Sequence, residues 1–285
     1  MSSSFQPFED LLTKEMQIRN YSGRTIKTYC SLLVNLEHII QKSLYEVDTE
    51  DFKSRLQYLI TQKRASVSTI NQLISAFKLF YVDVCHREWK EFHVKRPRSE
   101  KKLPVVLSLS EIGRMISVTS NLKHKAIIML TYSAGLRKME VIQMTLKDID
   151  SQRMRVRVVQ GKGKKDRYTL LSETTLFVLR QYYLSERPST YLFEPIGSKG
   201  KQMSETMVSH VVMSSAKKAG IKKDVTVHTL RHSFATHLLE AGVNIRQIQE
   251  FMGHTSFKTT ATYLHIARLN PSSITSPLDA IIISI

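Results

Sequence analysis

The segment from His228 to His232 combines side chains that could act together on one anion. On a helix His228 and Arg231 are three residues apart, so their Cβ atoms lie about 5–6 Å from each other on one face. Leu230 and Phe234 fall on the opposite face and would bury the helix. Arginine forms paired hydrogen bonds with phosphate, and imidazole transfers protons near neutral pH. The spacing therefore predicts phosphate chemistry, against the alternative of two surface side chains that share no ligand.

The same segment also has the histidine spacing of a zinc-protease helix, at His228 and His232. Such helices carry a glutamate directly after the first histidine, and Thr229 occupies that position here. No nearby acidic residue or cysteine offers a third ligand. We therefore expect no metal site in this segment.

Two further candidates follow towards the C-terminus. Gly253 ends a predicted short helix, His254 comes directly after it, and Tyr263 lies nine residues further on. A single helical tyrosine is usually a half-buried core residue, so Tyr263 by itself does not indicate a function. Residues 235–252 also have a helix-turn-helix outline, which supports a rival function, DNA recognition without catalysis.

Two cations lie upstream in positions that suit an anion. Arg137 follows Gly135-Leu136 at a predicted helix start, where backbone N–H groups and the helix dipole favour negative charge. Lys162 lies between glycines in a predicted hairpin turn, whose flexibility would let the ammonium reach into a groove. The alternative for Lys162 is an ordinary solvated turn lysine.

Charge and composition indicate the class of partner. The 285 residues include 42 Lys+Arg and 25 Asp+Glu, a net charge of +17, with 42% hydrophobic positions. Residues 1–100 hold 15 basic and 12 acidic side chains, so most of the excess lies in residues 101–285. The hydrophobic content excludes disorder, and the basic excess points to a polyanion held by the C-terminal part.

Other features bound the compartment. Cys30 and Cys85 lack a CxxC spacing and are too few for a disulfide framework, and no apolar signal segment follows Met1. The apolar run 280–285 is far shorter than the ~20 residues of a membrane span. We expect a cytoplasmic protein with no membrane contact.

Hydrophobic spacing predicts a mainly α fold with a small β element. The expected helices run from Phe8 onward and over 25–40, 48–62 and 66–84, with Thr49 and Ser66 as caps. Beyond a basic stretch bracketed by prolines, helices alternate with one predicted hairpin, 153–159 returning through 167–171. The expected division is a helical bundle over 1–95, a linker over 96–104, an α-rich domain over 105–268 and a tail over 269–285.

Taken together, the motifs resemble those of tyrosine site-specific recombinases, the phage integrase family, in its compact Xer-like form. The resemblance covers essentially the whole chain. It rests on five separated motifs in the family's order: Gly135-Leu136-Arg137-Lys138-Met139-Glu140, Gly161-Lys162-Gly163-Lys164-Lys165, His228-Thr229-Leu230-Arg231-His232, Met252-Gly253-His254 and Thr259-Thr260-Ala261-Thr262-Tyr263.

This resemblance implies roles for single residues. Tyr263 resembles the nucleophile that attacks a DNA phosphodiester, and Arg137 and Arg231 resemble the pair that grips its non-bridging oxygens. His254 resembles a hydrogen-bond donor to the phosphate, and His228 a residue that helps to deprotonate Tyr263.

Lys162 resembles the general acid for the leaving 5′-hydroxyl, and Glu140 matches an acidic position that could orient Arg137. Nearby cations are expected to favour loss of the Tyr263 proton. These cations also supply charge that many phosphoryl-transfer enzymes take from Mg²⁺, so we expect no metal and no cofactor.

For the whole protein, the resemblance implies a helical core-binding bundle over 1–95 and a catalytic domain over 105–268. Its partner would be double-stranded DNA with inverted half-sites. A dimer would bind each site and a tetramer would assemble in synapsis, on the nucleoid and with a further recombinase or regulator as an accessory partner. Two alternatives stay open: a non-catalytic helix-turn-helix regulator and a type IB topoisomerase.

Overall fold

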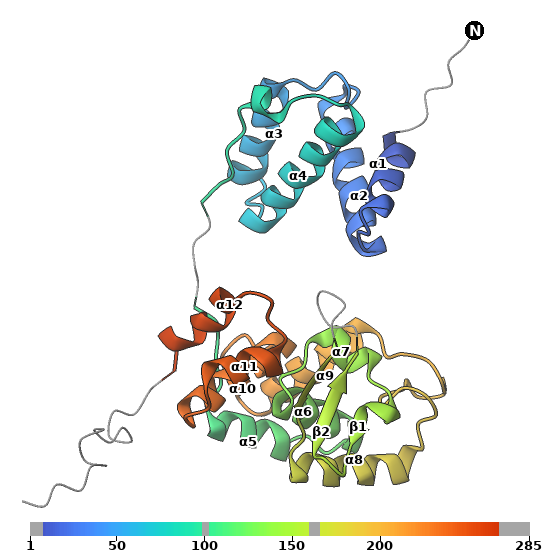
Figure 1. Cartoon of the computed structure of the whole chain (residues 1–285), viewed down its shortest axis with the longest axis vertical. Helices are drawn as coiled ribbons and strands as arrows, with labels where there is room; N and C mark the ends of the chain where they lie inside the picture. The colour runs from blue at the N-terminus through green and yellow to red at the C-terminus, as the bar shows by residue number, and fades with distance from the viewer. Residues whose placement is uncertain (1–7, 99–102, 160–165, 268–285) are drawn as a thin grey trace, which may run out of the picture. The chain divides into compact units, whose positions relative to one another are not determined.

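The computed structural model describes residues 8–98, 103–159 and 166–267. The chain divides into two compact units, Met1–Lys101 and Lys102–Ile285, each with its own hydrophobic core (Figure 1). Helices dominate both units, as the hydrophobic spacing predicts. None of the helices in the described part of the chain is long and apolar enough to span a membrane.

The N-terminal unit is a helical bundle around an aromatic core. Its helices are α1 (Phe8–Ile18), α2 (Gly23–Ile40), α3 (Thr49–Thr61) and α4 (Val67–Leu79), followed by a π-helical turn (Phe80–Val84) and a 3-10 helix (Trp89–Phe92). Phe52 stacks on Phe77, with ring centroids 4.5 Å apart, and Phe80 and Phe92 complete the cluster. Large aromatic surfaces supply much of the burial that holds a bundle of this size together.

Two local predictions for this unit need correction. Asp48, not Thr49, caps α3, because its carboxylate accepts from the Asp51 backbone N–H at 2.8 Å. The helix therefore begins at Thr49, one residue after the predicted start at Asp48. The helix expected over 66–84 changes to π-helical geometry at Phe80, while the cap at Ser66 is confirmed.

The C-terminal unit places a small sheet against a group of helices (Figure 1). In chain order it contains α5 (Leu109–Ser117), α6 (Leu122–Ser133), α7 (Lys138–Gln143), a 3-10 turn (Leu146–Asp148), β1 (Ile149–Asp150), β2 (Arg155–Val158), β3 (Arg167–Leu170), α8 (Glu173–Glu186), α9 (Glu205–Lys218), α10 (Val227–Glu240), α11 (Ile245–Met252), α12 (Phe257–Ala261) and a 3-10 helix (Thr262–His265). Helix α6 packs against α8, α9 and α10 and is buried along most of its length, so it forms the centre of the unit.

The hairpin is confirmed: β2 and β3 pair antiparallel, with Arg155 opposite Leu170 and Val158 opposite Arg167. A short strand, β1, extends the sheet in the order β1-β2-β3 and was not predicted. Two residues are too few to establish an alternating pattern. The predicted turn that carries Lys162 lies outside the described residues.

Near the C-terminus the last helical segments are short. Helix α12 covers Phe257–Ala261, and Ser256 makes no side-chain capping bond. The chain then tightens into the 3-10 helix, which carries Tyr263. The predicted tail, 269–285, lies outside the described residues.

Candidate active site

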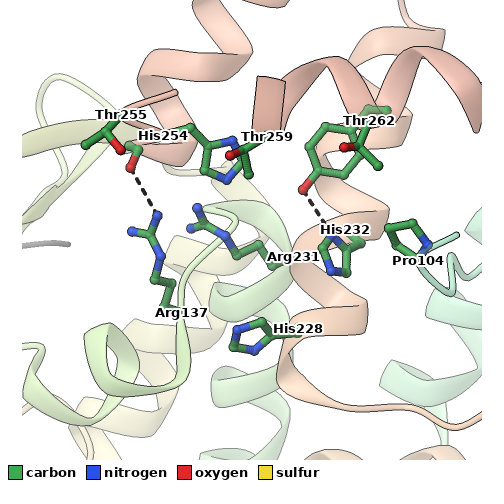
Figure 2. Close-up of a pocket in the computed structure, with 11 residues that line it drawn as sticks. Pro104, Arg137, His228, Arg231, His232, His254, Thr255, Thr259 and Thr262 are labelled. Atoms are coloured by element: carbon green, nitrogen blue, oxygen red, sulfur yellow. Dashed lines mark hydrogen bonds between the residues drawn. The ribbon is translucent and has the colours of Figure 1, made fainter. Parts of the chain in front are cut away.

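One pocket of about 300 Å³ in the C-terminal unit gathers five of the six predicted site residues (Figure 2). Lys162 lies outside the described residues. The pocket is lined by residues from the segment before α5, the start of α7, the first turns of α10, the segment after α11 and the last helical turns: Pro104, Arg137, His228, Arg231, His232, Gly253, His254, Thr255, Thr259, Thr262 and Tyr263.

Helix α10 positions three of these side chains. Its N-terminus is closed by a capping box in which Thr226 and Thr229 bond each other's backbone N–H groups. Leu230, Phe234 and other apolar residues bury the opposite face, as the spacing predicts. Arg231 is also buried, with 3% of its surface exposed, which the apolar pattern does not anticipate.

The buried Arg231 guanidinium is held by the ends of two other helices. It donates to the carbonyl of Gly135, just after α6, and to the carbonyl of Met252, the last residue of α11. Helix C-termini carry unpaired carbonyls and partial negative charge, so they suit a cation. Burial, with the nearby charge of Arg137, lowers the pKa of Arg231 to about 9, which leaves it charged at neutral pH.

A tight turn at Gly135 brings Arg137 to the same pocket. Gly135 has a φ of +60°, and a Cβ there would lie 2.3 Å from Cδ1 of the Phe234 ring. Arg137 then caps α7: its backbone N–H and its Nη1 both donate to Glu140, at 2.8 and 2.7 Å. Its Nη2 donates to the Gly253 carbonyl at 3.0 Å (Figure 2). The orienting contact expected between Glu140 and Arg137 is present.

Glu140 also binds a cation that the sequence analysis missed. Arg167, the first residue of β3, donates from both Nη atoms to the two Glu140 carboxylate oxygens at 2.8 Å each. Burial alone would raise the pKa of Glu140, but the hydrogen bonds and charge of Arg167 lower it to about 2. Strand alternation offered a signal: Arg167 shares its face with buried Thr169, and an inward-facing arginine needs an acidic partner.

Tyr263 is 2% exposed, and its hydroxyl lies 3.0 Å from Nδ1 of His232. Its ring lies between two imidazoles, with centroids 5.8 Å from that of His232 and 6.3 Å from that of His254. Burial raises the pKa of Tyr263 to about 12, against the opposing charges of Arg231 and Arg137. The two guanidiniums favour the phenolate, as expected, but in the protein without DNA the effect of burial is larger than theirs.

His254 follows the left-handed cap of α11 at Gly253 and bonds through Nδ1 to Oγ1 of buried Thr260, at 2.9 Å. Burial lowers the pKa of His254 to about 3 and that of His232 to about 4. Both imidazoles are therefore neutral at pH 7, and each can donate from one ring nitrogen and accept at the other.

His228 lies at the exposed start of α10, with its ring centroid 6.4 Å from that of His232. Partial burial and the Arg231 charge lower the pKa of His228. In the described part of the chain no group of three or more His, Cys, Asp or Glu side chains is arranged to hold a metal ion.

Comparison with known proteins decides the family. Residues 106–269 match the Phage integrase family model, and residues 9–91 match the model of a phage integrase N-terminal SAM-like domain. A tyrosine recombinase of Thermosipho africanus is 32% identical over 278 residues, which covers 94% of this chain and 96% of the relative. The chain belongs to the phage integrase family.

Further relatives indicate which type of phage integrase family member this chain is. Tyrosine recombinase XerA of Pyrococcus horikoshii is 32% identical over 256 residues, covering 88% of this chain and 86% of XerA. A lambda integrase fragment, solved as a dimer bound to a COC′ core site, superposes with a TM-score of 0.72 at 16% identity, covering 88% of this chain and 95% of that one, and so shares the fold. The protein is a tyrosine site-specific recombinase of the Xer-like type.

Proposed function

We propose that this recombinase cuts double-stranded DNA by attack of the Tyr263 hydroxyl on a phosphodiester held by Arg137 and Arg231. The observation that carries the proposal is one pocket of about 300 Å³ lined by the tyrosine and both guanidinium groups. Each guanidinium has five N–H donors. The bonds to Glu140 and to backbone carbonyls use two donors of Arg137 and two of Arg231, so others remain for phosphate oxygens.

The histidines assist as neutral groups. Nδ1 of His254 bonds Thr260, and if the Thr260 hydroxyl donates this bond, Nε2 carries the proton and can donate to a phosphate oxygen. His232 accepts the Tyr263 proton or holds the hydroxyl until DNA binds, since it is the imidazole within hydrogen-bond distance. His228 also lines the pocket, and from the first turn of α10 it would assist the removal of the Tyr263 proton.

The chemical step balances without an external reagent. The tyrosine oxygen gives its proton to His232 and forms a bond to phosphorus as the bond from phosphorus to the 5′-oxygen breaks, and the leaving 5′-oxygen takes a proton from Lys162 to become a hydroxyl. The product is a 3′-phosphotyrosyl link that keeps the energy of the phosphodiester, so a second 5′-hydroxyl can reverse the step without ATP. Arg137 and Arg231 supply the charge that a metal ion would otherwise supply, so we propose metal-independent cleavage.

DNA is proposed as the partner because its negatively charged phosphates attract a protein with a net charge of +17. We propose that residues 1–95 and 105–268 bind the duplex as core-binding and catalytic domains, joined by the linker over 96–104. Two protomers would bind inverted half-sites, in keeping with the lambda integrase dimer on its core site, and four would assemble for strand exchange. The protein would act on the nucleoid in the cytoplasm. An accessory recombinase or regulator is proposed as a further partner.

The two rival functions have less support. In a helix-turn-helix regulator the outline 235–252 would serve base recognition, yet α10 and α11 carry Arg231 and hold its guanidinium in place. A type IB topoisomerase would share the cleavage step but not strand exchange between two sites.

The test uses a DNA site selected from a random-sequence pool by the purified protein and nicked beside the cleavage position, so that cleavage traps a covalent adduct. The wild-type protein should form the adduct in EDTA. Arg231→Ala should bind the same duplex and form almost none, because the phosphate loses half of its guanidinium pair. Tight binding by the wild-type protein without any adduct would refute the proposal, and unimpaired cleavage by Arg231→Ala would remove Arg231 from its role.

A further inference from the structure

Arg167 is a nearly buried cation whose side-chain hydrogen bonds join two elements beside the active site. Only 9% of its side chain is exposed. Besides the paired bonds to Glu140, its Nε donates to the carbonyl of Phe251 at 2.8 Å. The side chain therefore links β3 to α7 and to the last turn of α11.

Three consecutive carbonyls at the C-terminal end of α11 each accept a hydrogen bond from a different arginine. The carbonyls of Phe251, Met252 and Gly253 accept hydrogen bonds from Arg167, Arg231 and Arg137, respectively. His254 follows directly. Each consecutive carbonyl thus fixes one guanidinium, and the turn sets the spacing of all three cations.

Close packing makes this arrangement sensitive to small shifts. A Cβ on Gly253 would lie 2.8 Å from Cδ of Arg167 and 3.1 Å from its Nε. The Arg167 stem therefore lies directly against the backbone of the turn. A change at Arg167 can move the Gly253 carbonyl that Arg137 bonds.

Arg167 also determines how strongly Glu140 binds the other cations. The Glu140 carboxylate, 6% exposed, bonds Arg137 and lies 3.8 Å from Arg231. Without Arg167, a buried carboxylate would be left with fewer donors, and it would draw on these two guanidiniums to replace them. Their positions relative to the phosphate would then change.

We propose that Arg167 is a positioning residue for DNA cleavage. It holds Glu140 and the α11 C-terminal turn in register, so that Arg137 and Arg231 direct their remaining donors at the same phosphate. The inference rests on the proposed phosphate-binding role of Arg137.

The test compares two substrates in single-turnover cleavage. One is the nicked duplex described above, and the other carries a methylphosphonate at the scissile position, which lacks the negative charge that the arginines neutralise. The variants are Arg167→Met and Arg167→Lys, and Arg137→Ala serves as the reference. Arg157→Met is the matched control, because Arg157 lies on the neighbouring strand β2 with an exposed side chain.

Arg167→Met should cleave the phosphodiester about 10²-fold more slowly, the cost of misplacing groups by about 1 Å, with unchanged DNA affinity. Arg167→Lys should lose less, because it keeps the charge but cannot make the paired bond. The loss should shrink on the methylphosphonate for both variants, as for Arg137→Ala, while Arg157→Met cleaves both substrates like the wild-type protein. If Arg167→Met does not fold, Arg167→Lys decides.

Equal losses on both substrates for the Arg167 variants would overturn the inference, since a smaller folded fraction lowers both rates alike. Wild-type cleavage of the phosphodiester by either variant would also overturn it. If Arg137→Ala itself shows equal losses on the two substrates, the proposed function fails rather than the inference alone.

Discussion

Replacing Gly135 with alanine should destabilise the C-terminal unit and leave the helical composition unchanged. A left-handed φ of +60° costs an alanine about 1–2 kcal/mol relative to glycine. The new Cβ would lie 2.3 and 2.6 Å from two carbons of the buried Phe234 ring and 3.2 Å from Sδ of Met252. Overpacking of this kind costs about 1–3 kcal/mol, so the expected total is roughly 3 kcal/mol.

Thermal unfolding followed by circular dichroism measures this effect. A domain of roughly 150–250 residues loses about 2–4 °C of Tm per kcal/mol, so Gly135→Ala should melt roughly 10 °C below the wild-type protein. Gly113 provides the control, because it lies within α5, and a Cβ there would meet nothing within 4 Å. Gly113→Ala should raise stability by up to about 1 kcal/mol. A Gly135→Ala protein that melts within about 1 °C of wild type would refute the packing described around the Arg137 turn.

Three further predictions concern the site. Thr260→Val removes the partner of His254 Nδ1 and should slow cleavage roughly fivefold, for a lost hydrogen bond of about 1 kcal/mol, with unchanged DNA binding in a gel-shift assay; equal rates would remove Thr260 from the site. The folded-state pKa values of His232 and His254, about 4 and 3, lie below the ordinary value of about 6.5, so the unfolded chain binds more protons between these limits. The urea midpoint should therefore fall as the pH drops below about 6.5, and less so in His254→Gln; an unchanged midpoint near pH 5 would contradict this assignment. Lys162→Ala should cleave a 5′-phosphorothiolate far better than the ordinary duplex, because a thiolate leaves without a proton, and absence of this rescue would exclude Lys162 as the general acid.

Much of the fold could be predicted because its signals are local. Apolar spacing and caps such as Ser66 are written within single segments, and the hairpin of β2 and β3 follows from alternation on both sides of a glycine-rich turn. The π-helical turn at Phe80 and the two-residue strand β1 depend on packing against distant segments. Neither leaves a periodic pattern to detect.

Some residues of the candidate site could likewise be predicted from local motifs, and others could not. Arg137, Arg231 and Tyr263 were found through motif order, and the structure brings them to one pocket. The partner of the Tyr263 hydroxyl, His232, and the role of Arg167 could not be found in this way. These contacts join residues 31 and 27 positions apart in the chain, and only the tertiary fold brings α10 to the last 3-10 helix and β3 to α7.

The expected effect of nearby cations on the pKa of Tyr263 is confirmed in direction, but the larger, opposing effect of burial could not be predicted. Sequence shows which cations lie nearby but not how much water the fold removes. With the ring 2% exposed, the cost of burying a phenolate exceeds the benefit from two guanidiniums, and the pKa rises to about 12.

The central claim is that Tyr263 becomes covalently joined to the 3′ side of the cut strand. The direct measurement is peptide mapping by mass spectrometry of the adduct formed on the nicked duplex in EDTA, after nuclease trimming of the DNA. The account predicts a nucleotide phosphate on the peptide that contains Tyr263, and no adduct with Tyr263→Phe. A nucleotide attached to any other residue, or an undiminished adduct with Tyr263→Phe, would contradict it.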